Sequence, residues 1–158
     1  MAGEGNPAFA PVFERLRGIL EPYGHRMHVT ADGPDGYGVD MAPESDRNPT
    51  TWFAGVRRGK AYVSYYLMPI YVEPSLLEDV SPKLKRRMQG KSCFNFRSVD
   101  DALIDELDAL TRRGFELTKG DPAWGVVKRE EHAMAYRKAM SARRQRVGGG
   151  AGGRSQER

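Results

Sequence analysis

Two short stretches of the sequence carry polar side chains of the kinds that bind ligands or take part in catalysis. The first contributes Tyr62, Ser64 and Tyr66, and the second contributes Lys91, Cys93 and Asn95. Alternate residues of a strand point to the same side of a sheet, so each trio would share one face. If the two strands are neighbours, the six side chains line a polar surface suited to a small ligand. The alternative is a face that only packs beneath a helix, with the tyrosine hydroxyls reaching water.

Cys93 is the only cysteine, and its first possible role is that of a nucleophile. A nucleophilic thiol needs a neighbouring base and a lowered pKa. Lys91 is close in sequence, but the three histidines have no diagnostic spacing to the thiol; they are His25, His28 and His132. Free cysteines are usually buried, so we expect Cys93 to be a small packing residue. No catalytic residue is predicted, and a non-enzymatic role is favoured.

Neither a metal site nor a cofactor is predicted. His25 and His28 lie in a segment that reads as loop and strand, without a Cys or carboxylate at ligand spacing. An acidic group consists of Asp100, Asp101, Asp105 and Glu106. A helix cannot wrap six oxygens around one cation, and these charges instead complement the positive end of a helix dipole. The chain contains no P-loop, GxGxxG, HExxH, CxxC or GxSxG sequence.

A basic group lies between the two polar stretches. Its members are Lys83, Lys85, Arg86 and Arg87, and Lys91 follows closely. Beside Tyr62 and Tyr66, these cations could contact phosphates while a tyrosine stacks on a base. The alternative is a solvated helix face that keeps the protein soluble.

Positive charge is concentrated at the C-terminal end of the chain. Residues 1–118 contain 15 Lys and Arg against 17 Asp and Glu, a net charge of −2. Residues 119–158 contain 10 against 4, a net charge of +6. The first hypothesis is therefore a non-enzymatic module that binds a small molecule or a protein on the polar sheet face. The second is a nucleic-acid-associated protein that uses the basic helix and the Arg-rich tail.

Periodicity and turn-forming residues predict the elements that would position these side chains. We expect strands at 28–31, 37–41, 52–56, 61–71 and 92–96, and helices over 9–20, over 82–89 and from 99 onward. Pro22 and Gly24 should end the first helix. Ser81 should cap the second helix and Ser98 the third. The core side of the two polar strands should carry Val63, Tyr65, Leu67, Phe94 and Phe96.

Strands in a meander with helices before and after predict an α+β fold. We expect a two-layer domain with an antiparallel sheet of about five strands and helices packed on one face. This single domain should span residues 1–118, and residues 119–158 should form a basic extension whose last part, 147–158, is disordered. One cysteine and no export signal favour the cytoplasm. No apolar run reaches the length of a membrane span, so no membrane association is expected.

Three blocks between Trp52 and Phe115 resemble the YdhG-like domains of unknown function. They read WFAGVRRGKAYVSYYLMPIY, SPKLKRRMQGKSCFNF and DALIDELDALTRRGF. The resemblance implies an α+β fold of the frataxin-like type and no assigned reaction. Some relatives are described as intracellular iron chaperones, and iron binding is a further alternative. That role relies on acidic surface residues in frataxin-type proteins, whereas the first helix here has only Glu14 and Glu21.

Overall fold

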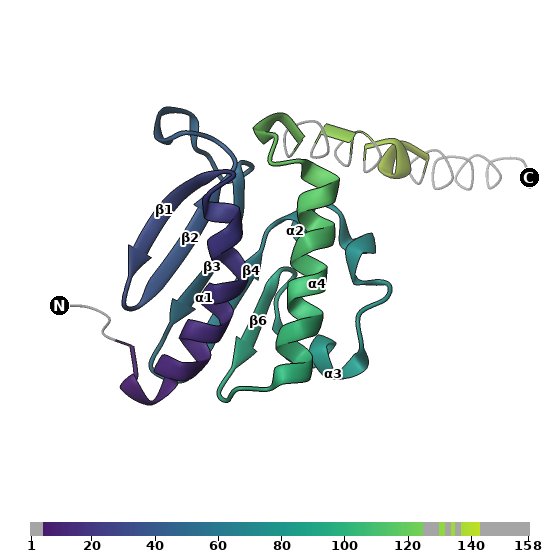
Figure 1. The fold of residues 1–158 in the computed structure, drawn as a ribbon. Coiled ribbons are helices and arrows are strands. Elements are labelled where there is room, and N and C mark those ends of the chain that lie inside the picture. The colour runs from purple at the N-terminus through teal and green to yellow at the C-terminus, as the bar shows by residue number, and fades with distance from the viewer. Residues whose placement is uncertain (1–4, 125–129, 132–133, 135–136, 143–158) are drawn as a thin grey trace, which may run out of the picture.

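The chain folds into one antiparallel β-sheet with two long helices packed against it (Figure 1). The structure is a computed structural model that describes residues 5–124, 130–131, 134 and 137–142. Within these residues, six strands form a sheet in the order β1-β2-β3-β4-β6-β5. The strands are β1 His28–Gly33, β2 Gly36–Asp40, β3 Trp52–Arg58, β4 Val63–Leu67, β5 Met88–Gln89 and β6 Cys93–Phe96. The stretch 147–158, which we expect to be disordered, lies outside the described residues.

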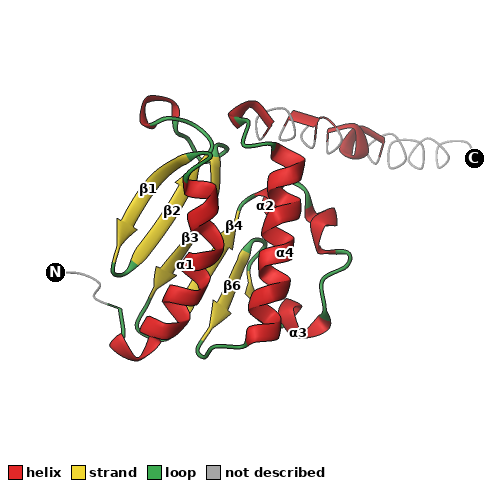
Figure 2. Cartoon of the chain, viewed as in Figure 1, coloured by secondary structure: helices red, strands yellow, loops and turns green. Residues whose placement is uncertain are grey.

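Helices α1 and α4 lie side by side on one face of the sheet (Figures 1 and 2). The helices are α1 Ala10–Gly24, α2 Pro69–Val72, α3 Pro82–Lys85 and α4 Asp101–Thr118, with short 3-10 turns η1 Pro7–Phe9, η2 Glu44–Asp46 and η3 Pro74–Leu77. The core fills the space between the helices and the sheet, where each buried large apolar side chain contributes about 1.5–3 kcal/mol. The predicted α+β architecture with helices on one face is confirmed, and the sheet has six strands where about five were expected.

Strands β4 and β6 alternate as predicted. Their completely buried core residues are Val63, Tyr65, Leu67, Phe94 and Phe96. The Tyr65 hydroxyl lies 2.6 Å from Thr111 Oγ1, which itself donates to the Leu107 carbonyl at 2.8 Å. Each buried hydroxyl therefore has a partner. Strand β4 is shorter than the predicted span of 61–71, because Pro69 lacks the N–H that a ladder needs and begins α2 instead.

A bulge in β3 decides which side chains reach each face of the sheet. Val39 pairs with Ala54 and Asp40 pairs with Trp52, which leaves Phe53 as an extra residue between them. Phe53 and Ala54 are both completely buried. An extra residue of this kind shifts the alternation of the strand. The bulge therefore leaves Trp52 on the face of the sheet that α1 and α4 do not cover.

One predicted helix end is right only in part, and one predicted cap is wrong. Helix α1 ends at Gly24, one of the two residues expected to end it, but Pro22 lies inside the helix. The last turn is held by Tyr23, which is buried and packs against the Phe53 ring at 5.6 Å between centroids. Helix α4 is capped by Asp100 and not by Ser98, because Asp100 Oδ1 accepts from the Leu103 amide at 3.2 Å.

The predicted helix over 82–89 is also wrong in its length. It begins as expected, with Ser81 Oγ accepting from the Leu84 amide at 3.1 Å, but α3 is a single turn that ends at Lys85. The chain then forms β5, in which Met88 pairs with Phe94 and Gln89 pairs with Cys93. Because strands place alternate residues on opposite faces, Met88 packs against the core and Gln89 points away from it.

Candidate functional site

The side of the sheet that lies behind α1 and α4 in Figure 1 presents two parallel rows of side chains. The first row runs across β2, β3, β4 and β6 and consists of Gly36, Arg57, Ser64 and Asn95, each the Cα partner of the next. Across the same strands and β5, the second row consists of Gly38, Gly55, Tyr66, Cys93 and Gln89. We call this surface the open face; its side chains are Trp52, Arg57, Tyr62, Ser64, Tyr66, Gln89, Cys93 and Asn95.

A hydrogen-bond network fixes the polar part of the open face. Ser64 Oγ donates to Asn95 Oδ1 at 2.9 Å, and Asn95 Nδ2 donates to Gln89 Oε1 at 2.7 Å. The Tyr62 hydroxyl donates to the same Gln89 oxygen at 3.3 Å, and Cys93 Sγ lies 3.5 Å from Asn95 Oδ1. These bonds use both ends of the Asn95 amide but only the oxygen of the Gln89 amide, and they hold the side chains in place. The open face therefore presents ordered donors and acceptors.

Five of the six residues predicted to share a site lie together on this surface. Tyr66 is the Cα partner of Cys93, and the network joins the other members. Lys91 is the exception: it lies in the turn between β5 and β6, where its Nζ is 5.5 Å from the centre of the Tyr71 ring. Sequence reasoning missed Gln89, because the segment that carries it was expected to be helical.

Trp52 and Tyr66 form an aromatic pair on the open face. Their ring centroids are 5.4 Å apart and their planes are tilted by 39°. The indole Nε1 donates to the Ala54 carbonyl at 3.0 Å. Residue 55 must be small, since a Cβ on Gly55 would lie 2.8 Å from Trp52 Cζ2. Both rings are half-buried, so each keeps an exposed portion on which a flat ligand can stack.

Two shallow hollows flank the aromatic pair. One has a volume of about 470 Å³, and its lining includes Gly36, Gly38 and Gly55, of which Gly36 is half-buried and the other two are buried. The other has a volume of about 300 Å³; its lining includes Arg57, Lys60, Tyr62, Ser64 and Tyr66. Glycines in a strand allow another molecule to approach the backbone closely. The open face thus offers two aromatic rings and cations beside two shallow hollows.

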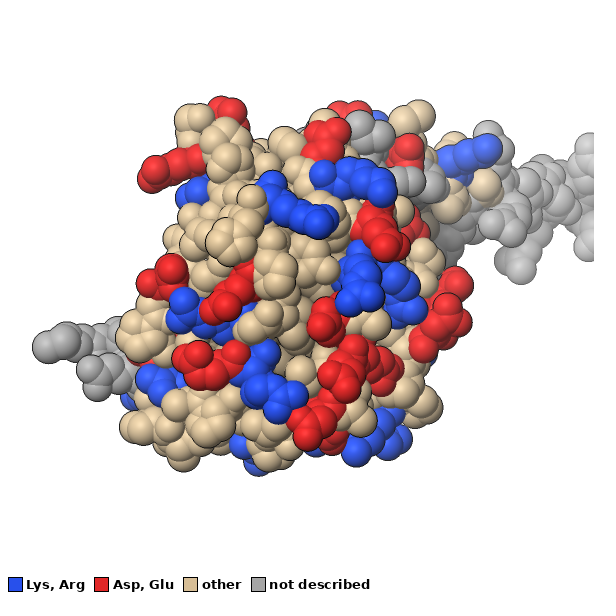
Figure 3. All heavy atoms as spheres, viewed as in Figure 1, with Lys and Arg blue, Asp and Glu red and all other residues tan. Residues whose placement is uncertain are grey.

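The charges on the open face differ from those on the helical side. Arg57 and Lys60 are exposed, and neither forms an ion pair with any described residue. Asp35 lines the larger hollow. Arg58 Nε donates to its carboxylate at 2.9 Å, and this hydrogen bond holds the pKa of Asp35 below its usual value. In contrast, Lys, Arg, Asp and Glu are interspersed over α1 and α4 (Figure 3).

The predicted phosphate-contacting residues on and after α3 do not form one group, because two of the four contact neighbouring side chains. Lys83 Nζ pairs with Asp100 Oδ2 at 3.0 Å. The Arg87 guanidinium lies over the Phe96 ring at 6.0 Å from its centroid. Lys85 and Arg86 are exposed. Because the helix is one turn long, these cations do not form a continuous helical face.

The site lacks the features of a nucleophilic or metal centre among the described residues. Burial raises the pKa of the Cys93 thiol, although hydrogen bonds from Ser64 and Tyr66 oppose that effect. A raised pKa keeps the sulfur protonated and weakly nucleophilic at neutral pH. In the described ranges, no three His, Cys, Asp or Glu side chains come close enough to hold a metal ion. His132 lies outside those ranges.

No protein-family model, no curated protein and no solved structure matches the chain. The resemblance to YdhG-like domains therefore stays a prediction. None of the helices in the described part has the length and apolar character that a membrane crossing requires.

Proposed function

We propose that the protein is a non-enzymatic binding module whose open face binds single-stranded nucleic acid. The observation that carries the proposal is the Trp52–Tyr66 pair beside the unpaired Arg57 and Lys60. Proteins that bind single strands combine aromatic stacking platforms with cations that follow the backbone. An antiparallel sheet with helices on one face and aromatic side chains on the other is one established way to present such a platform.

Each group on the open face has a distinct part in this proposal. A base stacks on the exposed portion of Tyr66 or Trp52. Arg57 is two residues from Gly55 along β3, about 7 Å away, and binds the adjoining phosphate. Gln89 supplies its amide Nε2, which the network does not use, to a base edge. The hollow beside Gly36 leaves room for the next nucleotide.

The charge distribution supports the same function. The net charge of −2 for residues 1–118 includes the acids of α1 and α4, which lie on the other side of the sheet. Arg57 on the open face and Lys60 at its edge form no ion pair with a described residue, so both remain available to a phosphate. The segment 119–158, with a net charge of +6, adds attraction that does not depend on sequence.

Fluorescence anisotropy with a labelled 12-nucleotide single-stranded DNA and the matching RNA tests the proposal. We expect saturable binding that weakens as salt rises. The negative slope of log K against log salt should be smaller in magnitude by about 0.7 in Arg57→Met, because one phosphate contact is lost. Arg15→Met is the matched control, because Arg15 pairs with Asp101 on the helical side. Absence of binding at low salt would refute the proposal.

The aromatic contribution is tested separately. We expect Tyr66→Leu to weaken binding at least fivefold, since stacking contributes about 1–3 kcal/mol per base. Tyr71→Leu is the control, because Tyr71 is 50% exposed and lies away from the open face. Equal affinity of the two variants would show that the basic segment binds alone and that the open face does not. Binding of a mononucleotide as tight as that of the 12-mer would indicate a small-ligand site instead.

A further inference from the structure

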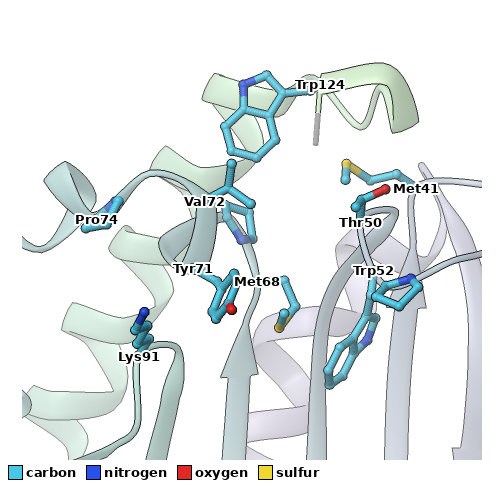
Figure 4. Close-up of a pocket in the computed structure, with 11 residues that line it drawn as sticks. Met41, Thr50, Trp52, Met68, Tyr71, Val72, Pro74, Lys91 and Trp124 are labelled. Carbon is cyan, nitrogen blue, oxygen red and sulfur yellow. The ribbon is translucent and has the colours of Figure 1, made fainter. Parts of the chain in front are cut away.

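Besides the two hollows of the open face, a recess lies at the end of the sheet where β3 begins and β4 finishes (Figure 4). Its volume is about 450 Å³, within the usual range of small-molecule sites. Most of its exposed lining is apolar, and the main contributors are Met41, Trp52, Met68, Tyr71, Val72 and Trp124. We call it the end pocket. It lies outside the open face, although Trp52 contributes to both.

Three separate turns build the walls of the end pocket. On one side, Asn48 Oδ1 accepts from the Thr50 amide at 2.8 Å and from the Thr50 hydroxyl, which fixes the loop before β3. At the base, the Met68 amide donates to the Phe53 carbonyl at 2.9 Å and starts α2. These hydrogen bonds preorganise the walls, which lowers the cost of ordering them around a ligand.

The third turn carries Trp124 over the pocket. Helix α4 ends with Lys119 in the left-handed conformation, at φ 55°, followed by Gly120 at φ 68°. Gly120 suits this conformation, and its close contact with Met27 leaves little space for a side chain. Asp121 then accepts from the Ala123 amide at 2.9 Å and begins a new turn. The reversal places the Trp124 indole above Val72 in Figure 4.

One positive charge faces this apolar space. Lys91 lines the end pocket and is exposed, with its Nζ 5.5 Å from the centroid of the Tyr71 ring. It forms no ion pair with a described residue, and none of the described residues that line the pocket is Asp or Glu. Among the described residues, an anion would therefore meet one cation and no opposing carboxylate, while an apolar body would contact the methionine and aromatic side chains.

We infer that the end pocket binds a small monoanion with an apolar body, held by Lys91 at its acidic group. Trp52 and Trp124 enclose the apolar part, and the flexible side chains of Met41 and Met68 adapt to its shape. This inference does not rest on the proposed nucleic-acid function. It assigns a second ligand class to a separate site.

The two tryptophans of the chain both line the end pocket, which makes the test direct. The probe is naphthalene-2-carboxylate, titrated into the full ¹⁵N-labelled chain while the two indole N–H signals are followed by NMR. The neutral naphthalene-2-carboxamide is the matched compound. We expect both indole signals to shift saturably with the carboxylate, and the carboxylate to bind about fivefold more tightly than the amide, as befits one partly exposed ion pair.

Two variants complete the test. Lys91→Met should remove the preference for the carboxylate and leave the spectrum outside the pocket unchanged. Lys85→Met, which removes an exposed lysine of α3 outside the pocket, should keep the preference. The inference is overturned if neither indole signal shifts at millimolar probe, or if Lys91→Met still prefers the carboxylate.

Discussion

Gly55→Ala is the substitution that most directly probes how the open face is built. The Cβ of an alanine at this position would lie 2.8 Å from Trp52 Cζ2 and 3.5 Å from the Tyr37 carbonyl oxygen. Ordinary carbon contacts begin near 3.5 Å, so the indole must move by about 0.7 Å or rotate away. Either movement weakens the contact with Tyr66 and the hydrogen bond to the Ala54 carbonyl.

The magnitude follows from these two contacts. The aromatic pair contributes about 0.5–1.5 kcal/mol beyond its buried area, and the indole hydrogen bond contributes about 0.5–1.5 kcal/mol. Replacing glycine with alanine restricts the unfolded chain and offsets about 0.4–1 kcal/mol of the loss. We therefore expect Gly55→Ala to lower the free energy of unfolding by about 1 kcal/mol, measured by urea denaturation.

Gly36→Ala is the matched control on the same face. A Cβ at Gly36 would meet only the Val56 carbonyl oxygen, at an ordinary 3.7 Å. This variant should be as stable as the wild type or slightly more stable. In Gly55→Ala, but not in Gly36→Ala, the indole N–H signal of Trp52 should also move. The reasoning fails if both variants have the same stability and neither changes that signal.

Three further predictions concern buried and titrating groups. Thr111→Val should lower the free energy of unfolding by about 1–3 kcal/mol, because it leaves the buried Tyr65 hydroxyl without its partner. Tyr65→Phe should lower it less. Urea denaturation of the two variants makes the comparison, and a larger loss in Tyr65→Phe would contradict the interpretation. The hydrogen bond from Arg58 lowers the pKa of Asp35, so the ionised carboxylate should stabilise the fold above about pH 3.8, and this contribution should be lost as the pH falls further. In thermal melts, Asp35→Asn should therefore lose less stability in acid than the wild type does. The same loss in both proteins would contradict this prediction. Because burial raises the pKa of the Cys93 thiol, iodoacetamide should modify it more slowly at pH 7 than it modifies free cysteine, and faster labelling would contradict that environment.

Much of the fold follows from local periodicity. The alternation of Tyr65 and Phe94 with polar neighbours predicts the core face correctly, because burying one face of a strand fixes its register. Helix boundaries are less predictable. Pro22 is tolerated inside α1 because the tertiary packing of Tyr23 holds the last turn, and packing of that kind is not visible in a local pattern.

The candidate site was predictable only in part for the same reason. Tyr66 and Cys93 were expected to share a face because each lies in a strand of clear alternation. Trp52 joins them through the bulge at Phe53, which no periodicity within β3 indicates. Gln89 was hidden because Pro82 to Lys85 does begin a helix, and the chain leaves it after one turn to pair with β6.

The central claim is that the open face is where the protein binds single-stranded nucleic acid. The most direct measurement is a titration of the ¹⁵N-labelled full chain with a 12-nucleotide single strand, followed residue by residue by NMR. The largest shifts are predicted at Arg57, Tyr66 and Asn95 and at the indole of Trp52, with small shifts along α1 and α4. Shifts confined to the helices or to the basic C-terminal segment, with the open face unchanged, would contradict the account.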